Sequence, residues 1–182
     1  MQTTTQTGRR RTAGAATLAL AASAGLAALG TSGASADDPG ASAPAMGPEV
    51  TVLAGRADFP DDIEVKIKRS LDGGPTEVLN LKDPGDIIVA RVDLAPGAAF
   101  QWHTHPGPVV VSVAQGQLTY QQSTDCVERL YGTSEAFVDP GNIVHTAWNG
   151  GDTDVVLYAT FYDVPAGEGP TRNEPVQDGW CD

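Results

Sequence analysis

The three histidines of this 182-residue chain are the side chains best suited to metal chemistry. His103 and His105 lie two positions apart, so on an extended strand both side chains point to the same face. His145 lies forty residues later, at the start of another β-type run. Neutral imidazole binds divalent metals well, and a third histidine from a neighbouring strand would complete a triad around one ion. By composition alone, a surface His-x-His turn and a hydrogen-bonded strand histidine fit the pattern as well.

Short β-strands are the elements that must position these histidines. Beyond residue 48 the apolar residues come in short runs rich in Val, Ile, Thr and aromatics, without a sustained helical period. Turn signals such as Ala95-Pro96-Gly97 and Asp139-Pro140-Gly141 separate the runs. Many short strands at this spacing are typical of an all-β sandwich or barrel. The clearest predicted strands span residues 63–67, 87–94, 109–114, 117–120, 143–148 and 155–162.

Two short motifs around the histidines resemble those of the cupins, which are double-stranded β-helix (jelly-roll-like) barrels. In the first motif, five residues separate Gly97 from His103-Thr104-His105, and Gly116 follows in register. In the second, Pro140, His145 and Asn149 occupy the expected positions. The resemblance covers roughly residues 85–163. It implies a cupin barrel whose interior holds one divalent metal ion (Fe, Mn, Ni, Cu or Zn) on His103, His105 and His145.

Three positions depart from these motifs. Val109 occupies the place of the glutamate that is usually the fourth ligand, and Asn142 and Ser134 replace two glycines. Three neutral histidines would leave the ion with its full double charge and with open positions, so it could polarise a bound carbonyl or enolate oxygen. Glu128 and Glu135, the carboxylates nearest in sequence to the second motif, are candidates to replace the missing ligand.

Other residues are candidates for places in or beside the pocket, together with Val109. Gln101 shares the strand parity of His103 and could donate a hydrogen bond there, or be an ordinary polar strand residue. Tyr120 and Tyr158 could point a hydroxyl into the barrel, although strand tyrosines commonly serve in packing. Asn149 is expected to stabilise the end of the second-motif hairpin.

The first 36 residues have the pattern of a secretory signal peptide. Arg9, Arg10 and Arg11 precede an apolar stretch, and Ala34-Ser35-Ala36 supplies a small-residue cleavage site, so cleavage is predicted after Ala36. An uncleaved membrane anchor is the alternative, although the stretch is rich in Ala and Gly and therefore weakly hydrophobic. The adjacent arginines leave both general secretory and twin-arginine export open.

The remaining chain is predicted to have three parts. Residues 37–48 consist largely of Ala, Pro, Gly, Ser and Asp and form a disordered lead-in. Residues 49–165 form the barrel domain, and residues 166–182 form an irregular C-terminal tail. Cys126 and Cys181 fall in the exported part, where oxidising conditions favour a disulfide that would tether this tail. Two free thiols are the alternative.

Charge limits the partners of the protein. The chain carries a formal charge of -12, and none of its 23 acidic residues precedes residue 37, so export makes the mature chain still more negative. Nucleic acid is therefore excluded as a partner, and no membrane association is expected after cleavage. A small-molecule ligand or substrate is expected instead. The sequence leaves open whether two barrels associate through an edge as a homodimer.

Two classes of function fit these features. The first is a metal-dependent enzyme, an oxidoreductase (dioxygenase-like) or a related isomerase-like catalyst that acts on a small oxygenated molecule. The open coordination positions support it. The second is a non-catalytic module that binds a metal, a sugar or another small ligand. The missing glutamate and the lack of a clear general base support that alternative. The resemblance implies a fold that hosts both classes.

Overall fold

A computed structural model describes residues 47–181 of the chain. The predicted signal peptide, most of the lead-in and the last residue lie outside these described residues. Within them the chain forms β-strands and no helix, so no helix there could cross a membrane.

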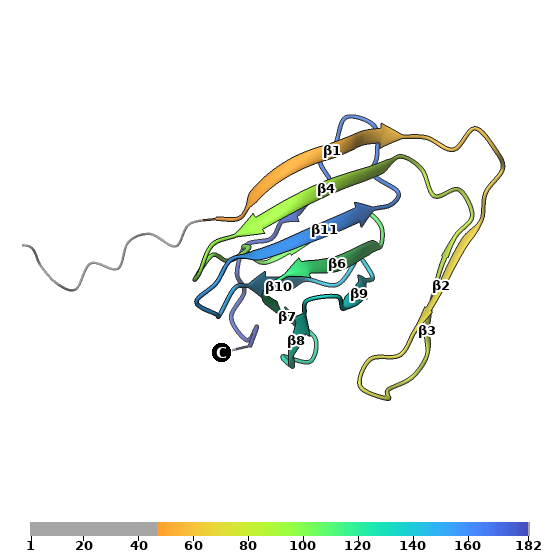
Figure 1. The fold of residues 1–182 in the computed structure, drawn as a ribbon. Helices are drawn as coiled ribbons and strands as arrows, with labels where there is room; N and C mark the ends of the chain where they lie inside the picture. The colour runs from red at the N-terminus through yellow and green to blue at the C-terminus, as the bar shows by residue number, and fades with distance from the viewer. Residues whose placement is uncertain (1–46, 182) are drawn as a thin grey trace, which may run out of the picture. The chain divides into compact units, whose positions relative to one another are not determined.

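Twelve strands follow one another along the described part of the chain (Figure 1). Their bounds are β1 Glu49–Ala57, β2 Val65–Arg69, β3 Glu77–Leu81, β4 Ile87–Leu94, β5 His103–Thr104, β6 Val109–Gln115, β7 Gln117–Gln122, β8 Glu128–Gly132, β9 Ala136–Asp139, β10 His145–Trp148, β11 Val155–Phe161 and β12 Arg172–Asn173.

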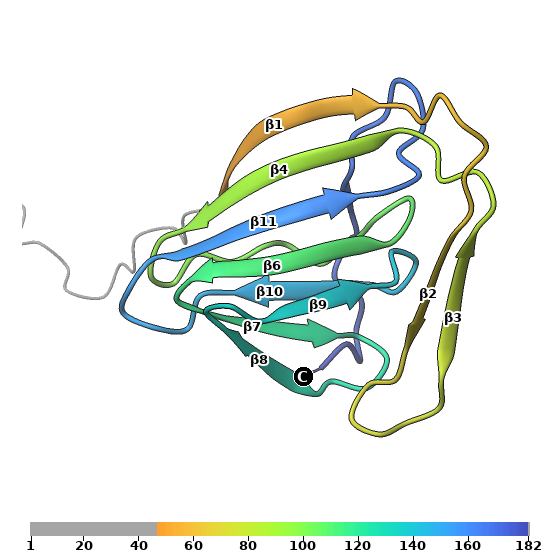
Figure 2. The same cartoon turned by 45° about the vertical axis from the view of Figure 1, so that its right-hand side comes forward.

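Two five-stranded antiparallel sheets form the barrel. Figure 2 shows β1, β4, β11 and β6 of the first sheet side by side. One sheet has the order β1-β4-β11-β6-β9, and the other has the order β12-β5-β10-β7-β8. Strands β2 and β3 form a separate antiparallel hairpin. Neighbouring strands in both sheets are mostly far apart in sequence, as in a double-stranded β-helix. The predicted all-β barrel is therefore confirmed.

The core lies between the two sheets because each strand turns its apolar residues inward. In β4, buried and half-buried residues alternate strictly, with Ala90, Val92 and Leu94 pointing inward. Arg91 and Asp93 of the same strand point outward and form an ion pair of 2.6 Å. Alternation with a period of two follows from the pleat of a strand that has one face in a core.

The predicted strand runs all fall on strands, with ends that shift by a few residues. Strands β1, β3, β8, β9 and β12 were not among the runs predicted from sequence. Four of them join the sheets by pairing, β1 with β4, β8 with β7, β9 with β6 and β12 with β5. Pairing between distant segments, rather than local composition, makes these residues strands.

A candidate three-histidine metal site

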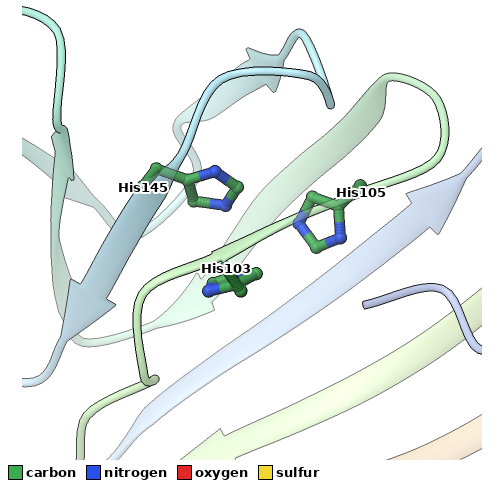
Figure 3. A group of neighbouring side chains, drawn as sticks. All are labelled: His103, His105 and His145. Atoms are coloured by element: carbon green, nitrogen blue, oxygen red, sulfur yellow. The ribbon is translucent and has the colours of Figure 1, made fainter. Parts of the chain in front are cut away.

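The three histidines meet inside the barrel because β5 and β10 are neighbours in one sheet. His103 and His145 lie directly opposite each other in the β5–β10 register. His105 directly follows the end of β5, and its backbone N–H donates to the Gly141 carbonyl at 2.8 Å. We call His103, His105 and His145 the histidine triad (Figure 3). Its members are 3–8% exposed, and one nitrogen from each lies within 4.8 Å of those of the other two.

A backbone carbonyl oxygen lies within hydrogen-bond distance of Nδ1 in each of the three rings. His103 Nδ1 lies 2.7 Å from the Gln101 oxygen, His105 Nδ1 lies 2.7 Å from the Pro170 oxygen, and His145 Nδ1 lies 2.9 Å from the Ile143 oxygen. Because a carbonyl oxygen can only accept a hydrogen bond, these contacts require the proton on Nδ1. Each Nε2 then keeps a free lone pair, the arrangement by which proteins orient histidine ligands of metals.

Burial keeps two of these imidazoles neutral. In the metal-free protein, burial is the main cause that lowers the pKa of His103 to about 3, with further lowering by His145 and His105. Burial also lowers the pKa of His105 to about 4, although the Asp139 carboxylate acts in the opposite direction. Neutral imidazole is the form that binds a metal ion, so His103 and His105 need no deprotonation near neutral pH.

These lowered pKa values predict that acid destabilises the metal-free protein. Unfolded histidines bind protons below a pH of about 6.5, whereas folded His103 and His105 stay neutral until far lower pH. The unfolded state therefore gains up to two protons, and the free energy of unfolding falls by at most about 2.7 kcal/mol per pH unit. Urea unfolding at pH 7.5, 6.5 and 5.5 measures this fall. His103→Gln should make it shallower, and equal slopes would contradict the assignment.

A small cavity of about 90 Å³ lies beside the triad. Its walls are mostly aliphatic and aromatic, and include Val109, Val111, Leu157, Ala159 and Phe161. Apart from the triad, the polar side chains that line it belong to Tyr120, Asp139 and Thr171. The cavity could therefore hold a small ligand next to an ion on the three Nε2 atoms.

Comparison with known proteins identifies the fold family. Residues 90–161, which include both histidine segments and the strands around them, match the cupin domain family model. Residues 90–161 are therefore a cupin domain.

Curated relatives of the chain include two plant proteins. The chain is 34% identical over 80 residues to the auxin-binding protein ABP19b of Prunus persica, a match covering 41% of this chain and 38% of that protein. The auxin-binding protein ABP20 of Prunus persica is also 34% identical over 80 residues. The chain therefore spans about two fifths of the length of the relatives it matches.

Solved structures of distant sequence also resemble this cupin. A cupin domain from Bordetella pertussis is 17% identical, with 68% of this chain and 100% of that chain covered and a TM-score of 0.45. The polyketide cyclase RemF from Streptomyces resistomycificus is 16% identical, with 52% and 65% covered and a TM-score of 0.43.

Asp139 is the carboxylate that enters this cupin site, and sequence reasoning missed it. Val109, which replaces the motif glutamate, lines the cavity, and its partner in the β6–β9 register is Asp139. Glu128 and Glu135 do not take the vacant place. Both are exposed, and Glu135 accepts a hydrogen bond from the Gly132 backbone instead. In the sequence, Asp139 appeared only as part of the turn signal Asp139-Pro140-Gly141, which gave no sign that this acid lies buried opposite Val109.

A chain of hydrogen bonds holds Asp139 in place. Its Oδ2 accepts a 2.5 Å hydrogen bond from the Tyr120 hydroxyl and lies 3.2 Å from His145 Nδ1. Its Oδ1 accepts a 2.6 Å bond from the Gly141 backbone N–H. The Gln122 amide donates to the Tyr120 oxygen at 2.9 Å. Asp139 therefore supports the ring of His145 from behind.

The other candidate residues differ in their relation to the site. The Gln101 side chain is exposed, which favours the alternative of an ordinary polar residue, and only its backbone carbonyl contacts the triad. Tyr158 is 41% exposed and does not line the cavity, so the idea that it points inward is wrong. Asn149 lies outside the cavity and bonds the Leu94 and Thr153 carbonyls, as expected for a residue that ends a hairpin.

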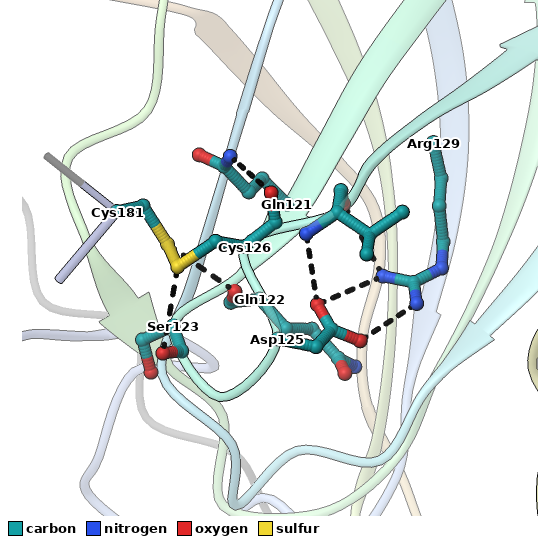
Figure 4. The surroundings of a disulfide bond; sticks show 8 residues. Gln121, Gln122, Ser123, Asp125, Cys126, Arg129 and Cys181 are labelled. Carbon is teal, nitrogen blue, oxygen red and sulfur yellow. Dashed lines mark hydrogen bonds and ion pairs between the residues drawn. A yellow bond between two sulfur atoms is a disulfide. The ribbon is translucent and has the colours of Figure 1, made fainter.

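The C-terminal tail closes one side of the site. Pro170 and Thr171 line the cavity, and β12 pairs with β5 beside His103. A disulfide joins Cys126 to Cys181, so the tail is tied at its far end to the segment between β7 and β8 (Figure 4). The tail thus supplies the carbonyl that orients His105, which no local motif predicts.

Proposed function

We propose that this protein is a secreted, metal-dependent cupin enzyme that acts on a small oxygenated molecule. In this proposal His103, His105 and His145 bind one divalent ion through Nε2. The observation that carries the proposal is the arrangement of the triad, in which backbone carbonyls hold each Nδ1 and leave each Nε2 free beside a cavity. Dioxygenase-like or isomerase-like chemistry fits three protein ligands with open positions.

The side chains around the triad have distinct tasks in this proposal. A bound ion would act as a Lewis acid toward an oxygen atom of the substrate. The apolar walls exclude water from that atom, which strengthens electrostatic interactions there. Burial and the neighbouring Asp139 raise the pKa of Tyr120, so its hydroxyl keeps its proton and holds Asp139 rather than acting as a base.

A non-catalytic binding role is the second candidate. Both acid–base groups of the cavity beyond the triad, Tyr120 and Asp139, are already engaged in hydrogen bonds. A protein that only binds a ligand needs no free base. Two relatives are named auxin-binding proteins, which is consistent with ligand binding.

Export is part of the proposal. The Cys126–Cys181 disulfide supports an oxidising compartment, and the N-terminal pattern of basic, apolar and small residues supports a signal peptide cleaved after Ala36. N-terminal sequencing of protein recovered from the medium of the expressing cells tests the cleavage position.

Elemental analysis tests the proposed metal site. Protein purified without added metal is expected to contain about one divalent ion per chain, and reconstitution after chelation should restore that ratio. Absence of metal after both treatments would contradict the proposal. Identification of iron, manganese, nickel or copper would favour the enzyme, because these ions support oxygen or isomerase chemistry.

A further inference from the structure

We infer that the cavity selects a ligand of about six non-hydrogen atoms or fewer that has an apolar body and at most one negative charge. This inference rests on the proposed metal site, and it names the class of molecule that would bind beside the ion. It follows from the charge, polarity and size of the cavity.

The charge of the cavity sets the first limit. Asp139 is 1% exposed and is the one carboxylate among the lining residues, and no lysine or arginine lines the cavity in the described part of the chain. With three neutral imidazoles, a divalent ion and Asp139 leave one net positive charge. A ligand with one negative charge neutralises it. A second charge on the ligand would be buried without a counterion, which is costly at low dielectric.

No neighbouring group is free to change this balance. Both oxygens of Asp139 already accept hydrogen bonds, from the Tyr120 hydroxyl and the Gly141 N–H, so the carboxylate is fixed in the wall. Arg69 lies near enough to influence Tyr120, but it bonds Glu77 at 2.6 Å and the Val138 carbonyl at 2.8 Å. Arg69 therefore cannot neutralise the second negative charge of a doubly charged ligand in the cavity.

The polarity and size of the cavity set the second limit. Its volume of about 90 Å³ is smaller than the engineered cavity of about 150 Å³ that holds benzene. Beyond the triad, only Tyr120, Asp139 and Thr171 offer polar side chains, and the first two are engaged. A sugar would bury several hydroxyls without partners, at a cost for each one. A compact ligand with a methyl or similar body avoids that cost.

Oxalate and pyruvate test the charge limit because they have the same number of non-hydrogen atoms and differ by the exchange of an oxyanion for a methyl group. The full protein is loaded with Co²⁺, and its visible spectrum reports binding of each ligand. The ratio of oxalate affinity to pyruvate affinity is expected to be at least tenfold smaller in the protein than for free Co²⁺ in the same buffer. An equal ratio would overturn the inference.

Two variants test whether the charge of Asp139 causes the lower oxalate-to-pyruvate affinity ratio. Asp139→Asn removes the fixed charge and should raise the oxalate-to-pyruvate ratio about tenfold, whereas Asp152→Asn, a matched change at an exposed turn residue, should leave it unchanged. No change in Asp139→Asn would refute the role of Asp139. Failure to bind Co²⁺ at all would instead refute the proposed metal site, so the two failures are distinguishable.

Hydroxypyruvate tests the apolar body. It adds one hydroxyl to the methyl group of pyruvate and keeps the charge and the donor atoms. 2-Oxobutanoate, which adds a methyl group at the same place, is the control of equal size. The hydroxyl of hydroxypyruvate would meet an aliphatic wall, so its binding to the Co²⁺ protein is expected to be at least fivefold weaker than that of 2-oxobutanoate. Equal or tighter binding would show that the wall does not select an apolar body.

Discussion

His103→Ala is expected to lower metal affinity by at least a hundredfold while leaving the fold largely intact. Loss of one of three ligands leaves two imidazoles, and no carboxylate stands at Val109 to compensate. The barrel core is apolar and does not depend on the imidazole. Metal content after dialysis and thermal unfolding with and without chelator measure the two properties separately.

Gln101→Ala is the matched control for this prediction. Its side chain is exposed, and its contribution to the site is a backbone carbonyl that the substitution retains. Metal affinity should therefore stay within about twofold of that of the unaltered protein. If His103→Ala unfolds the protein, or retains the metal as Gln101→Ala does, the ligand assignment for His103 is wrong.

Removal of the disulfide is expected to lower both stability and metal affinity. The bond closes a loop with a sequence separation of 55, for which the chain-entropy relation gives about 4 kcal/mol. Cys126→Ala combined with Cys181→Ala should lower the free energy of unfolding by about this amount. A freer tail also weakens the bond from His105 Nδ1 to the Pro170 oxygen, so metal affinity should fall several-fold.

Reducing agent supplies the control for the second prediction. Dithiothreitol should shift urea unfolding of the unaltered protein toward that of the double variant and should leave the double variant unchanged. Metal affinity of the oxidised and double-variant proteins, measured by competition with a chelator, completes the test. Equal stability of the two proteins would show that the tail is held by its other contacts, including the β5–β12 pairing.

The sequence alone predicted those features that depend on local periodicity. Alternation along a strand places His103 and His105 on one face, and the strongest apolar runs became β4, β6 and β11. These predictions held because side-chain direction follows the two-residue period of the pleat. The same reasoning left the direction of Tyr158 open, since the run around it is apolar on both faces and its parity does not show which face is inside.

Tertiary structure alone decided which distant groups complete the site. Asp139 enters the cavity because β9 pairs with β6 in a register that sets it opposite Val109, and the turn in which it lies gives no sign of that pairing. Pro170 reaches His105 because the tail runs back across the barrel to its disulfide. Such contacts join residues that are far apart in sequence, and they depend on backbone atoms and on strand register. The side chains of a short segment do not reveal either of these.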